Sequence, residues 1–385
     1  MGKPRNVEDY RKLAAGRLPR MVFDYLDGAA ESERGLRRNA AAIETICFDP
    51  KRLEDVSKRD LSIELFGRKQ QMPLVIAPTG LNGALWADGD VMLARAAANA
   101  GIPFVLSTAS NVTIEEVADR AGGDLWFQLY VVQRTLARSL TDRALAAGYK
   151  TLVLTVDVAV NGKRERDMRN GFAIPFRYSP RAMLDGVMHP SWLMRQLSHG
   201  LPALANFASA GSTDVNAQAA LMNRQMDASF AWDDLKALRD LWPHTLLVKG
   251  VLSADEAERC VGLGVDGVVI SNHGARQLED VAAPIAKLPE FAGRLHQPIL
   301  VDSGFRRGAD VVKALALGAN AVMLGRATLY GLAAGGEAGV ADVLRIIRQE
   351  IDTTLALIGC ARAADLGSKF ILGHTVPRSL GEAEG

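Results

Sequence analysis

Eight short apolar segments that alternate with helix-like segments are the strongest constraint on the fold of this chain. Each is rich in Val, Ile and Leu, as buried parallel strands are. They lie at residues 74–77, 104–107, 125–129, 152–156, 246–248, 267–270, 299–301 and 321–324. Strands that alternate with helices pair in parallel, and eight such units close into a TIM (β/α)8 barrel. The pattern therefore predicts an α/β barrel across residues 74–360.

The segments between these strands show helical periodicity, and several of them end at glycine, as helix C-caps do. Helices are predicted at residues 88–100, 113–120, 135–147, 232–241, 254–263, 283–291, 309–317 and 340–358.

Two stretches interrupt the alternation of strands and helices. Residues 6–30 repeat apolar side chains every three or four positions, so we expect an N-terminal helical extension over residues 1–70. Strands four and five are separated by roughly 90 residues, whereas the other strands start roughly 20 to 30 residues apart. Residues 158–230 are therefore predicted to be an insertion after strand four. The whole chain, 1–385, is interpreted as one domain.

Composition excludes several classes of protein. The formal net charge of +1 gives no general attraction to nucleic acid. The three cysteines, Cys47, Cys260 and Cys360, are far apart and form no CxxC pair, and the histidines show no metal-ligand spacing. We therefore expect no metal site and a reducing, cytoplasmic location. The N-terminus has no apolar signal region and no apolar run is long enough to span a bilayer, so neither a signal peptide nor a spanning helix is expected.

Polar residues follow the apolar segments at the point where each predicted strand ends. The carboxyl ends of the strands of a TIM barrel meet at one mouth, so these side chains are expected to converge there. The residues concerned are Pro78, Thr79, Gly80, Ser107, Gln128, Tyr130, Thr155, Asp157, Lys249, Ser271, His273, Arg276, Asp302, Gly304, Arg306, Gly325 and Arg326.

The stretch from Ser271 to Gln277 combines a base with a fixed cation. Histidine is a common base in enzymes, so His273 could accept a proton, and Arg276 carries a planar guanidinium that suits a carboxylate. An isolated pair of this kind is often only structural, but the convergence of the other strand ends favours an active site. Asp157 could pair with His273 and fix its tautomer. Glycines and arginines after strands seven and eight suit a phosphate group.

Three motifs in these positions resemble one known family. SNHGARQ at 271–277, DSGFRRG at 302–308 and LGR at 324–326 are similar to the FMN-dependent 2-hydroxy-acid oxidases and dehydrogenases, and the likeness covers nearly the whole chain. Within the family, PTGLNGALW at 78–86 and DVAVNGKRERD at 157–167 look most like the membrane-bound bacterial branch that acts on (S)-mandelate.

The resemblance implies roles for the residues that contact the substrate. His273 matches the active-site base, and Asp157 matches its partner. Arg164 and Arg276 match the pair that binds the substrate carboxylate, while Tyr25 and Tyr130 match phenols that hydrogen-bond the substrate. The residues leave open whether His273 removes the proton from the α-carbon or from the hydroxyl while hydride passes to the flavin.

The resemblance also implies a set of FMN contacts. One group matches contacts to the flavin ring, and another matches contacts to the ribityl chain and phosphate. The first comprises Pro78, Thr79, Gly80, Ser107, Gln128, Thr155, Lys249 and Ser271, and the second comprises Asp302, Gly304, Arg306, Gly325 and Arg326.

The implied reaction is oxidation of an (S)-2-hydroxy acid, with (S)-mandelate giving phenylglyoxylate and electrons passing to a membrane quinone. An L-lactate dehydrogenase and a soluble oxidase that uses O2 are the alternatives, and Gly80, where oxidases often carry alanine, favours a dehydrogenase. A silent phosphate-binding barrel is an alternative from another class. The resemblance further implies a homotetramer.

The insertion carries a possible membrane signal. Residues 161–200 hold seven Lys or Arg and three acidic residues, and residues 196–223 hold no Lys or Arg. Apolar Leu197, Leu201, Leu204 and Phe207 lie in this second part, and basic residues beside an apolar segment suit an anionic membrane surface. A mobile lid or a subunit contact would explain the same composition. The resemblance favours a membrane segment at 177–215 on the cytoplasmic face of the inner membrane.

Overall fold

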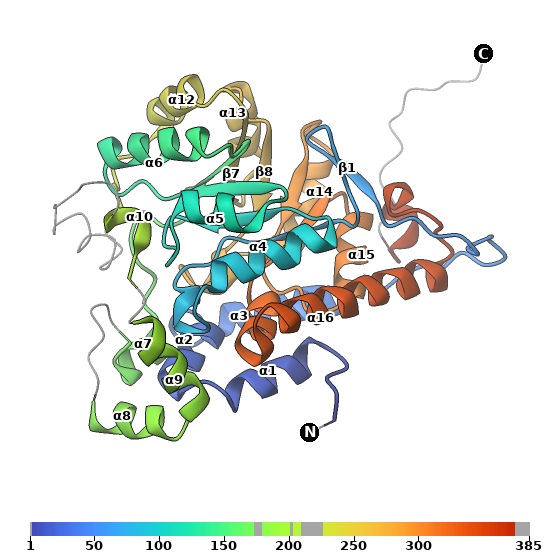
Figure 1. Ribbon diagram of the computed structural model, residues 1–385. Helices are drawn as coiled ribbons and strands as arrows, with labels where there is room; N and C mark the ends of the chain where they lie inside the picture. The colour runs from blue at the N-terminus through green and yellow to red at the C-terminus, as the bar shows by residue number, and fades with distance from the viewer. Residues whose placement is uncertain (1, 173–178, 201–202, 209–225, 374–385) are drawn as a thin grey trace, which may run out of the picture.

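Eight parallel strands close into a barrel at the centre of the protein (Figure 1). The computed structural model describes residues 2–172, 179–200, 203–208 and 226–373. The strands pair in the order β10-β3-β4-β5-β6-β7-β8-β9. Their bounds are β3 Leu74–Ile76, β4 Phe104–Ser107, β5 Leu125–Leu129, β6 Thr151–Thr155, β7 Thr245–Val251, β8 Gly267–Ile270, β9 Ile299–Val301 and β10 Ala321–Leu324. The predicted TIM barrel is confirmed, and each predicted strand coincides with one of these.

Helices surround the barrel and bury the outward side chains of its strands. They are α4 Gly89–Ala100, α5 Ile114–Ala121, α6 Arg134–Ala146, α12 Trp232–Leu241, α13 Ala254–Gly262, α14 Pro284–Ala292, α15 Gly308–Ala316 and α16 Arg326–Ile358. The last of these begins 14 residues before the predicted start at 340, because an apolar helical stretch precedes Gly335 and Gly336. Those two glycines leave helical geometry and bend the helix, and the positive φ of 60° at Gly336 suits glycine.

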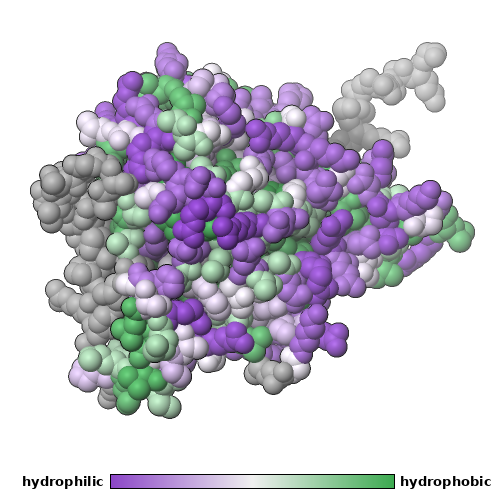
Figure 2. All heavy atoms as spheres, in the orientation of Figure 1, coloured by the Kyte–Doolittle hydropathy of each residue, from purple (hydrophilic) through white to green (hydrophobic). Residues whose placement is uncertain are grey.

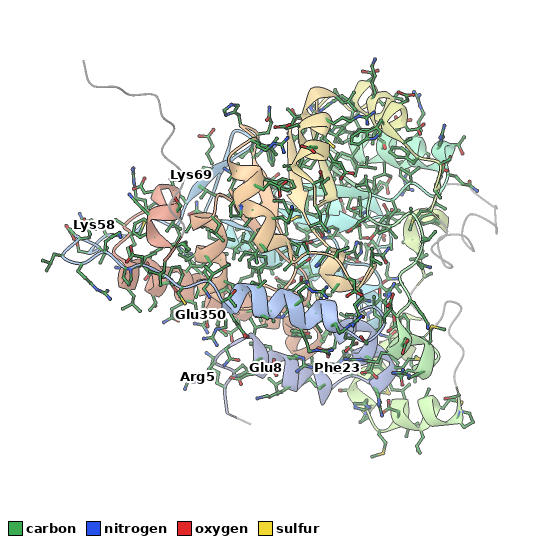
Figure 3. All side chains as sticks on the ribbon, turned by 180° about the vertical axis from the view of Figure 1, so that it is seen from behind. Arg5, Glu8, Phe23, Lys58, Lys69 and Glu350 are labelled. Carbon is green, nitrogen blue, oxygen red and sulfur yellow. The ribbon has the colours of Figure 1, made fainter. Side chains whose placement is uncertain are left out.

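The N-terminal extension packs beside the barrel as three helices, α1 Val7–Ala15, α2 Arg20–Asp27 and α3 Arg34–Glu44. In the view from behind, Glu8 of α1 and Phe23 of α2 lie along one edge of the molecule, and Lys69 lies on the opposite side (Figure 3). The first two helices fall inside the segment predicted to be helical. The third lies beyond residues 6–30 but within the helical extension expected over residues 1–70, and it begins after Glu33, which has a left-handed conformation and no side-chain cap.

A small hairpin, β1 Ile63–Leu65 and β2 Arg68–Gln70, packs against the N-terminal end of the barrel. The side chain of Leu65 joins the barrel's interior cluster, and the ring of Phe66 lies 5.8 Å from that of Trp126. Helical periodicity did not predict this hairpin. It closes the barrel at the end opposite the mouth, so the interior opens only toward the strands' carboxyl ends.

The insertion contributes α7 Glu165–Asn170, α8 Pro180–Val187, α9 Pro190–His199 and α10 Ala205–Ala208 within the described ranges. Figure 1 places α7, α8 and α9 together beside α2. Helix α9 is fixed to the loop after β3, which contains the short helix η1 (Asn82–Ala84), because Trp192 Nε1 donates to Ala84 O at 2.8 Å and Gln196 Nε2 donates to Gly83 O at 2.9 Å.

The expected membrane signal needs correction at several residues. Phe207 is fully buried and Leu204 packs against the core, so neither forms an exposed apolar face. Arg164 is buried, Arg166 pairs with Asp24, Asp27 and Glu33, and Arg195 stacks on Trp86. These cations were counted as a basic surface, but they serve contacts inside the protein. Arg177 and Leu201 lie outside the described residues.

Within the predicted segment 177–215, a group of exposed apolar side chains that includes Leu197 lies on α8 and α9, and we call it the α8–α9 patch. Green spheres gather over these two helices in Figure 2. The members of the patch, each at least 60% exposed, are Met183, Leu184, Val187, Met188, Met194 and Leu197. Within the described ranges, no helix is both long enough and apolar enough to cross a membrane.

The hairpin's contribution to stability can be measured with one buried and one exposed substitution. We expect Leu65→Ala to lower the free energy of unfolding by about 2–5 kcal/mol, because it leaves a cavity against the barrel interior. Lys69→Ala, on the exposed side of β2, should change it by less than about 0.5 kcal/mol. Urea unfolding of both variants measures the difference, and equal stabilities would contradict the packing role of the hairpin.

Candidate active site

The carboxyl ends of the strands line one cavity together with α2 and parts of the insertion. Most residues expected at the mouth line it, and four of them stand just behind its wall. Those lining the cavity are Tyr25, Pro78, Thr79, Gly80, Ser107, Tyr130, Arg164, Lys249, His273, Arg276, Asp302, Gly304, Arg306, Gly325 and Arg326. The four that are not among the lining residues are Gln128, Thr155, Asp157 and Ser271.

His273 is held from both sides of its ring. It lies in η2 (His273–Ala275) with a positive φ of 57°, a conformation that costs energy in a non-glycine residue. Nδ1 donates to Asp157 Oδ1 at 2.9 Å, and the hydroxyl of Tyr130 lies 3.2 Å from Nε2. A carboxylate on Nδ1 keeps the proton on that nitrogen, so Nε2 presents its lone pair to the cavity.

Asp157 stays ionised beside the histidine. Burial favours its neutral form, but the charges of His273 and Lys249 and the hydrogen bond from His273 outweigh burial and lower the pKa of the carboxyl. Its second oxygen, Oδ2, has no hydrogen-bond partner among the residues that the structure describes. A fixed negative charge on Asp157 stabilises a positive charge on His273 whenever the imidazole gains a proton.

Two arginines flank the ring of Tyr25 at the mouth. The guanidinium of Arg276 lies 5.1 Å from the ring centroid, and that of Arg164 lies 5.8 Å from it. Arg276 Nη1 donates to the carbonyls of Tyr25 and Gly28 at 2.9 and 2.8 Å, which fixes the guanidinium to the end of α2. These contacts put two positive charges at one side of the cavity.

Phe172 of the insertion is a further residue near this side, and the sequence interpretation did not include it. Its ring stacks on Tyr25 with centroids 4.2 Å apart. The only sequence signal was an aromatic residue shortly after Arg164, which is too common to identify a contact. The stacking ties the insertion to the ring that both arginines flank.

Lys249 and Asp302, which also line the cavity, form a buried ion pair. Lys249 Nζ lies 2.9 Å from Asp302 Oδ2 and donates to Ser271 Oγ at 2.8 Å. Burial alone would lower the pKa of this lysine, but the charges of Asp302 and Asp157 outweigh it and raise that pKa. Lys249 therefore keeps its positive charge at the end of β7.

Arg326 is a buried cation beside other cations. Burial, together with the charges of Arg306 and Arg276, lowers the pKa of its guanidinium to about 10. Its Nη1 donates to Asp27 O and Gly28 O at 3.1 and 3.3 Å, and among the described residues its guanidinium forms no ion pair with a carboxylate. Such a cluster favours an anion between Arg326 and Arg306.

The model of the FMN-dependent dehydrogenase family matches residues 14–372 of this chain. The chain belongs to that family. It is 58% identical over 371 residues to the (S)-mandelate dehydrogenase of Pseudomonas putida, covering 96% of this chain and 94% of that protein. It is 42% identical over 376 residues to the L-lactate dehydrogenase of Pectobacterium atrosepticum, covering 96% and 97%.

Solved structures of this FMN-dependent dehydrogenase family agree with the fold. The crystal structure of the monotopic membrane protein (S)-mandelate dehydrogenase has a TM-score of 0.94 at 57% identity, covering 97% of this chain and 100% of that one. A mandelate oxidase variant with (S)-mandelic acid has a TM-score of 0.81 at 32% identity, covering 96% and 98%.

FMN is the cofactor of the family, and the residues of this chain fit it. Three buried polar atoms at strand ends have no hydrogen-bond partner among the described residues: Thr79 Oγ1, Gln128 Nε2 and Thr155 Oγ1. Buried polar atoms nearly always form hydrogen bonds in native proteins. These three atoms therefore suit a ligand with donors and acceptors along one edge, as a flavin ring has. The cations around Arg326 supply a place for the phosphate.

Proposed function

We propose that this FMN-dependent dehydrogenase oxidises (S)-mandelate to phenylglyoxylate. One observation carries the proposal: a histidine whose Nδ1 is held by Asp157 turns Nε2 toward a cavity that also contains Arg164 and Arg276. A base beside two cations suits an anionic hydroxy acid. The greater identity to a mandelate dehydrogenase than to an L-lactate dehydrogenase favours mandelate over lactate.

The cavity offers separate places for the parts of the substrate. The carboxylate is proposed to lie between Arg164 and Arg276, next to Tyr25, and the hydroxyl next to Tyr130 and His273. The same cavity has apolar walls at Leu81, Val158, Leu204 and Met226, which suit an aromatic ring better than the methyl group of lactate.

The side chains of the site remove one proton from the substrate and stabilise two charges, the substrate carboxylate and the imidazolium of His273. The arginines offset the carboxylate's negative charge, which otherwise opposes removal of a proton from the neighbouring carbon or oxygen. His273 takes that proton at Nε2, and Asp157 stabilises the resulting imidazolium. FMN, when bound, accepts the two electrons released as the alcohol becomes a ketone. Both routes, proton loss from carbon or from the hydroxyl, use His273 in the same position.

We assign the FMN contacts as the sequence suggested. The ring is proposed to contact Pro78, Thr79, Gly80, Ser107, Gln128, Thr155, Lys249 and Ser271, with the charge of Lys249 stabilising negative charge on the ring. The ribityl chain and phosphate are proposed to contact Asp302, Gly304, Arg306, Gly325 and Arg326. The unpaired atoms of Thr79, Gln128 and Thr155 support the first set, and the repulsion among arginines supports the second.

The α8–α9 patch is proposed to enter the cytoplasmic surface of the inner membrane. Six large apolar side chains on two adjacent helices exceed the scattered exposure usual on a soluble surface. The crystal structure of the related (S)-mandelate dehydrogenase is described as that of a monotopic membrane protein. Membrane binding would bring the flavin site near a quinone, the proposed electron acceptor. The homotetramer stays a prediction.

A steady-state screen tests the substrate. With a dye as electron acceptor, we expect kcat/KM for (S)-mandelate to exceed that for L-lactate and glycolate by at least about tenfold, because aryl burial adds roughly 1.5–3 kcal/mol. A higher kcat/KM for L-lactate would contradict the assignment of substrate without affecting that of the family.

Replacing the proposed base tests the mechanism. His273→Ala should lower kcat by several orders of magnitude, because it removes the imidazole proposed to accept the proton, while the purified protein keeps its flavin colour. Tyr130→Phe, which removes only the hydroxyl near Nε2, is the milder comparison. Near-normal turnover by His273→Ala would exclude His273 as the base.

Sedimentation of membranes tests the patch. The triple variant Leu184→Gln, Met188→Gln, Leu197→Gln should move from the membrane pellet to the supernatant and keep its kcat/KM with the dye. A control replaces three exposed leucines elsewhere, Leu53, Leu357 and Leu372, by Gln and should remain with membranes. Pelleting of the patch variant, or a wild-type protein that stays in the supernatant at low salt, would contradict membrane insertion through this patch.

A further inference from the structure

Asp90 is a buried carboxylate that takes no part in the proposed chemistry. It lies in the first turn of α4 with no exposed surface. Burial raises the pKa of this carboxyl to about 6, and hydrogen bonds from Asn82, Ser110 and the Asn111 backbone limit the rise. Burying a charged carboxyl costs free energy, and an apolar side chain of similar size would avoid that cost. Asp90 is therefore expected to have a role besides packing.

Asn82 connects Asp90 to the loop after β3. Its Nδ2 donates to Asp90 Oδ1 at 2.7 Å and to the Thr79 carbonyl at 3.0 Å. Two acceptors on one side fix the orientation of the amide. Its Oδ1 is buried and has no hydrogen-bond partner among the described residues. The amide therefore acts through the two hydrogen bonds that it donates.

The loop between β3 and α4 needs such support because its backbone is strained. Leu81 and Asp88 both have positive φ, 60° and 55°, and neither is glycine. Conformations of this kind persist only where surrounding contacts enforce them. Leu81 N donates to Ala109 O at 3.0 Å, and Gly83 N donates to Asn111 Oδ1 at 2.8 Å, so the loop is also tied to the segment after β4.

The supported part of the loop faces the cavity. Thr79 and Gly80 line it, and Gly80 O accepts a hydrogen bond from the Tyr25 hydroxyl at 3.3 Å. A methyl group on Gly80 would lie 2.9 Å from Ala109 Cβ, so this backbone has little room to shift toward its neighbour. A substitution at Asn82 would therefore displace both the backbone proposed to contact the flavin and the Gly80 carbonyl that accepts from Tyr25.

We propose that Asp90 is a positioning residue that, through Asn82, sets the Thr79–Gly80 backbone against the flavin. This inference rests on the proposed placement of the FMN ring beside residues 78–80. Asp90 accepts with both oxygens, Oδ1 from Asn82 Nδ2 at 2.7 Å and Oδ2 from Asn111 N at 3.4 Å. Asparagine at 90 has the same shape but one acceptor oxygen, so it loses the bond to Asn82 or the bond to Asn111.

The test uses the FMN-loaded enzyme and reads the flavin directly. We expect Asp90→Asn to shift the flavin's absorption spectrum and reduction potential and to lower kcat for (S)-mandelate by about 10- to 100-fold, the scale of a small misplacement at a reacting centre. Asp88→Asn, an exposed neighbour that pairs with Arg120, is the matched control and should leave all three unchanged.

A double variant separates positioning from stability. In Asn82→Asp with Asp90→Asn, the bond between the two side chains returns with its direction reversed, so thermal stability should recover relative to Asp90→Asn. In this double variant the Thr79 carbonyl has no donor, because a carboxylate at 82 carries no N–H, so an altered spectrum, potential and kcat should persist. Recovery of all of these together with stability, or no flavin change in Asp90→Asn, would overturn the proposal.

A second variant, Asn82→Ala, tests the same proposal. If Asp90→Asn does not fold, Asn82→Ala, which removes the bonds to Asp90 and to Thr79 and leaves the carboxylate at 90, should also change the flavin, and an unchanged spectrum and potential there would overturn the proposal. The spectrum and potential need no substrate. A wild-type enzyme that fails to oxidise mandelate would therefore contradict the proposed function without deciding the role of Asp90.

Discussion

Closure of eight parallel strands is the constraint on which the rest of the structure depends. Each strand is short and apolar, and closure brings all eight carboxyl ends to one mouth while the β1–β2 hairpin fills the other end. His273 follows β8 and Asp157 follows β6, yet their side chains meet at 2.9 Å because the barrel sets the distance between these strands. Without closure, the histidine would have neither its partner nor its orientation.

Charge organises the mouth once closure has formed it. The carboxylate of Asp157 accepts a hydrogen bond from His273 and that of Asp302 pairs with Lys249, whereas Arg326 lies near Arg306 and Arg276 and donates to backbone carbonyls. Several guanidinium groups therefore lie close together on the side of the cavity lined by the ends of β9, β10 and α2. A phosphate and a carboxylate are the anions that FMN and a 2-hydroxy acid would bring, so cofactor and substrate both offset repulsion that the folded protein otherwise bears.

The sequence predicted what local pattern determines. Apolar strands, their polar ends and the His273–Asp157 pair follow from periodicity and barrel geometry, and the family resemblance added Tyr25, Arg164 and the FMN. Contacts made by tertiary packing were not predictable. The sequence pattern placed Leu204, Phe207 and Arg195 on an outer face because it records polarity without direction, and the structure turns all three inward. The Asp90–Asn82–Thr79 connection was missed for the same reason, since an ordinary polar loop carries no signal of what each side chain bonds.

The central claim is that one mouth holds FMN and a base able to oxidise (S)-mandelate. Anaerobic mixing of the purified yellow protein with each enantiomer of mandelate, followed by flavin absorbance, tests it most directly. The account predicts rapid loss of the yellow colour with (S)-mandelate, little change with the (R) enantiomer and slow return of colour in air. A protein that binds FMN but keeps its colour in (S)-mandelate would contradict the account.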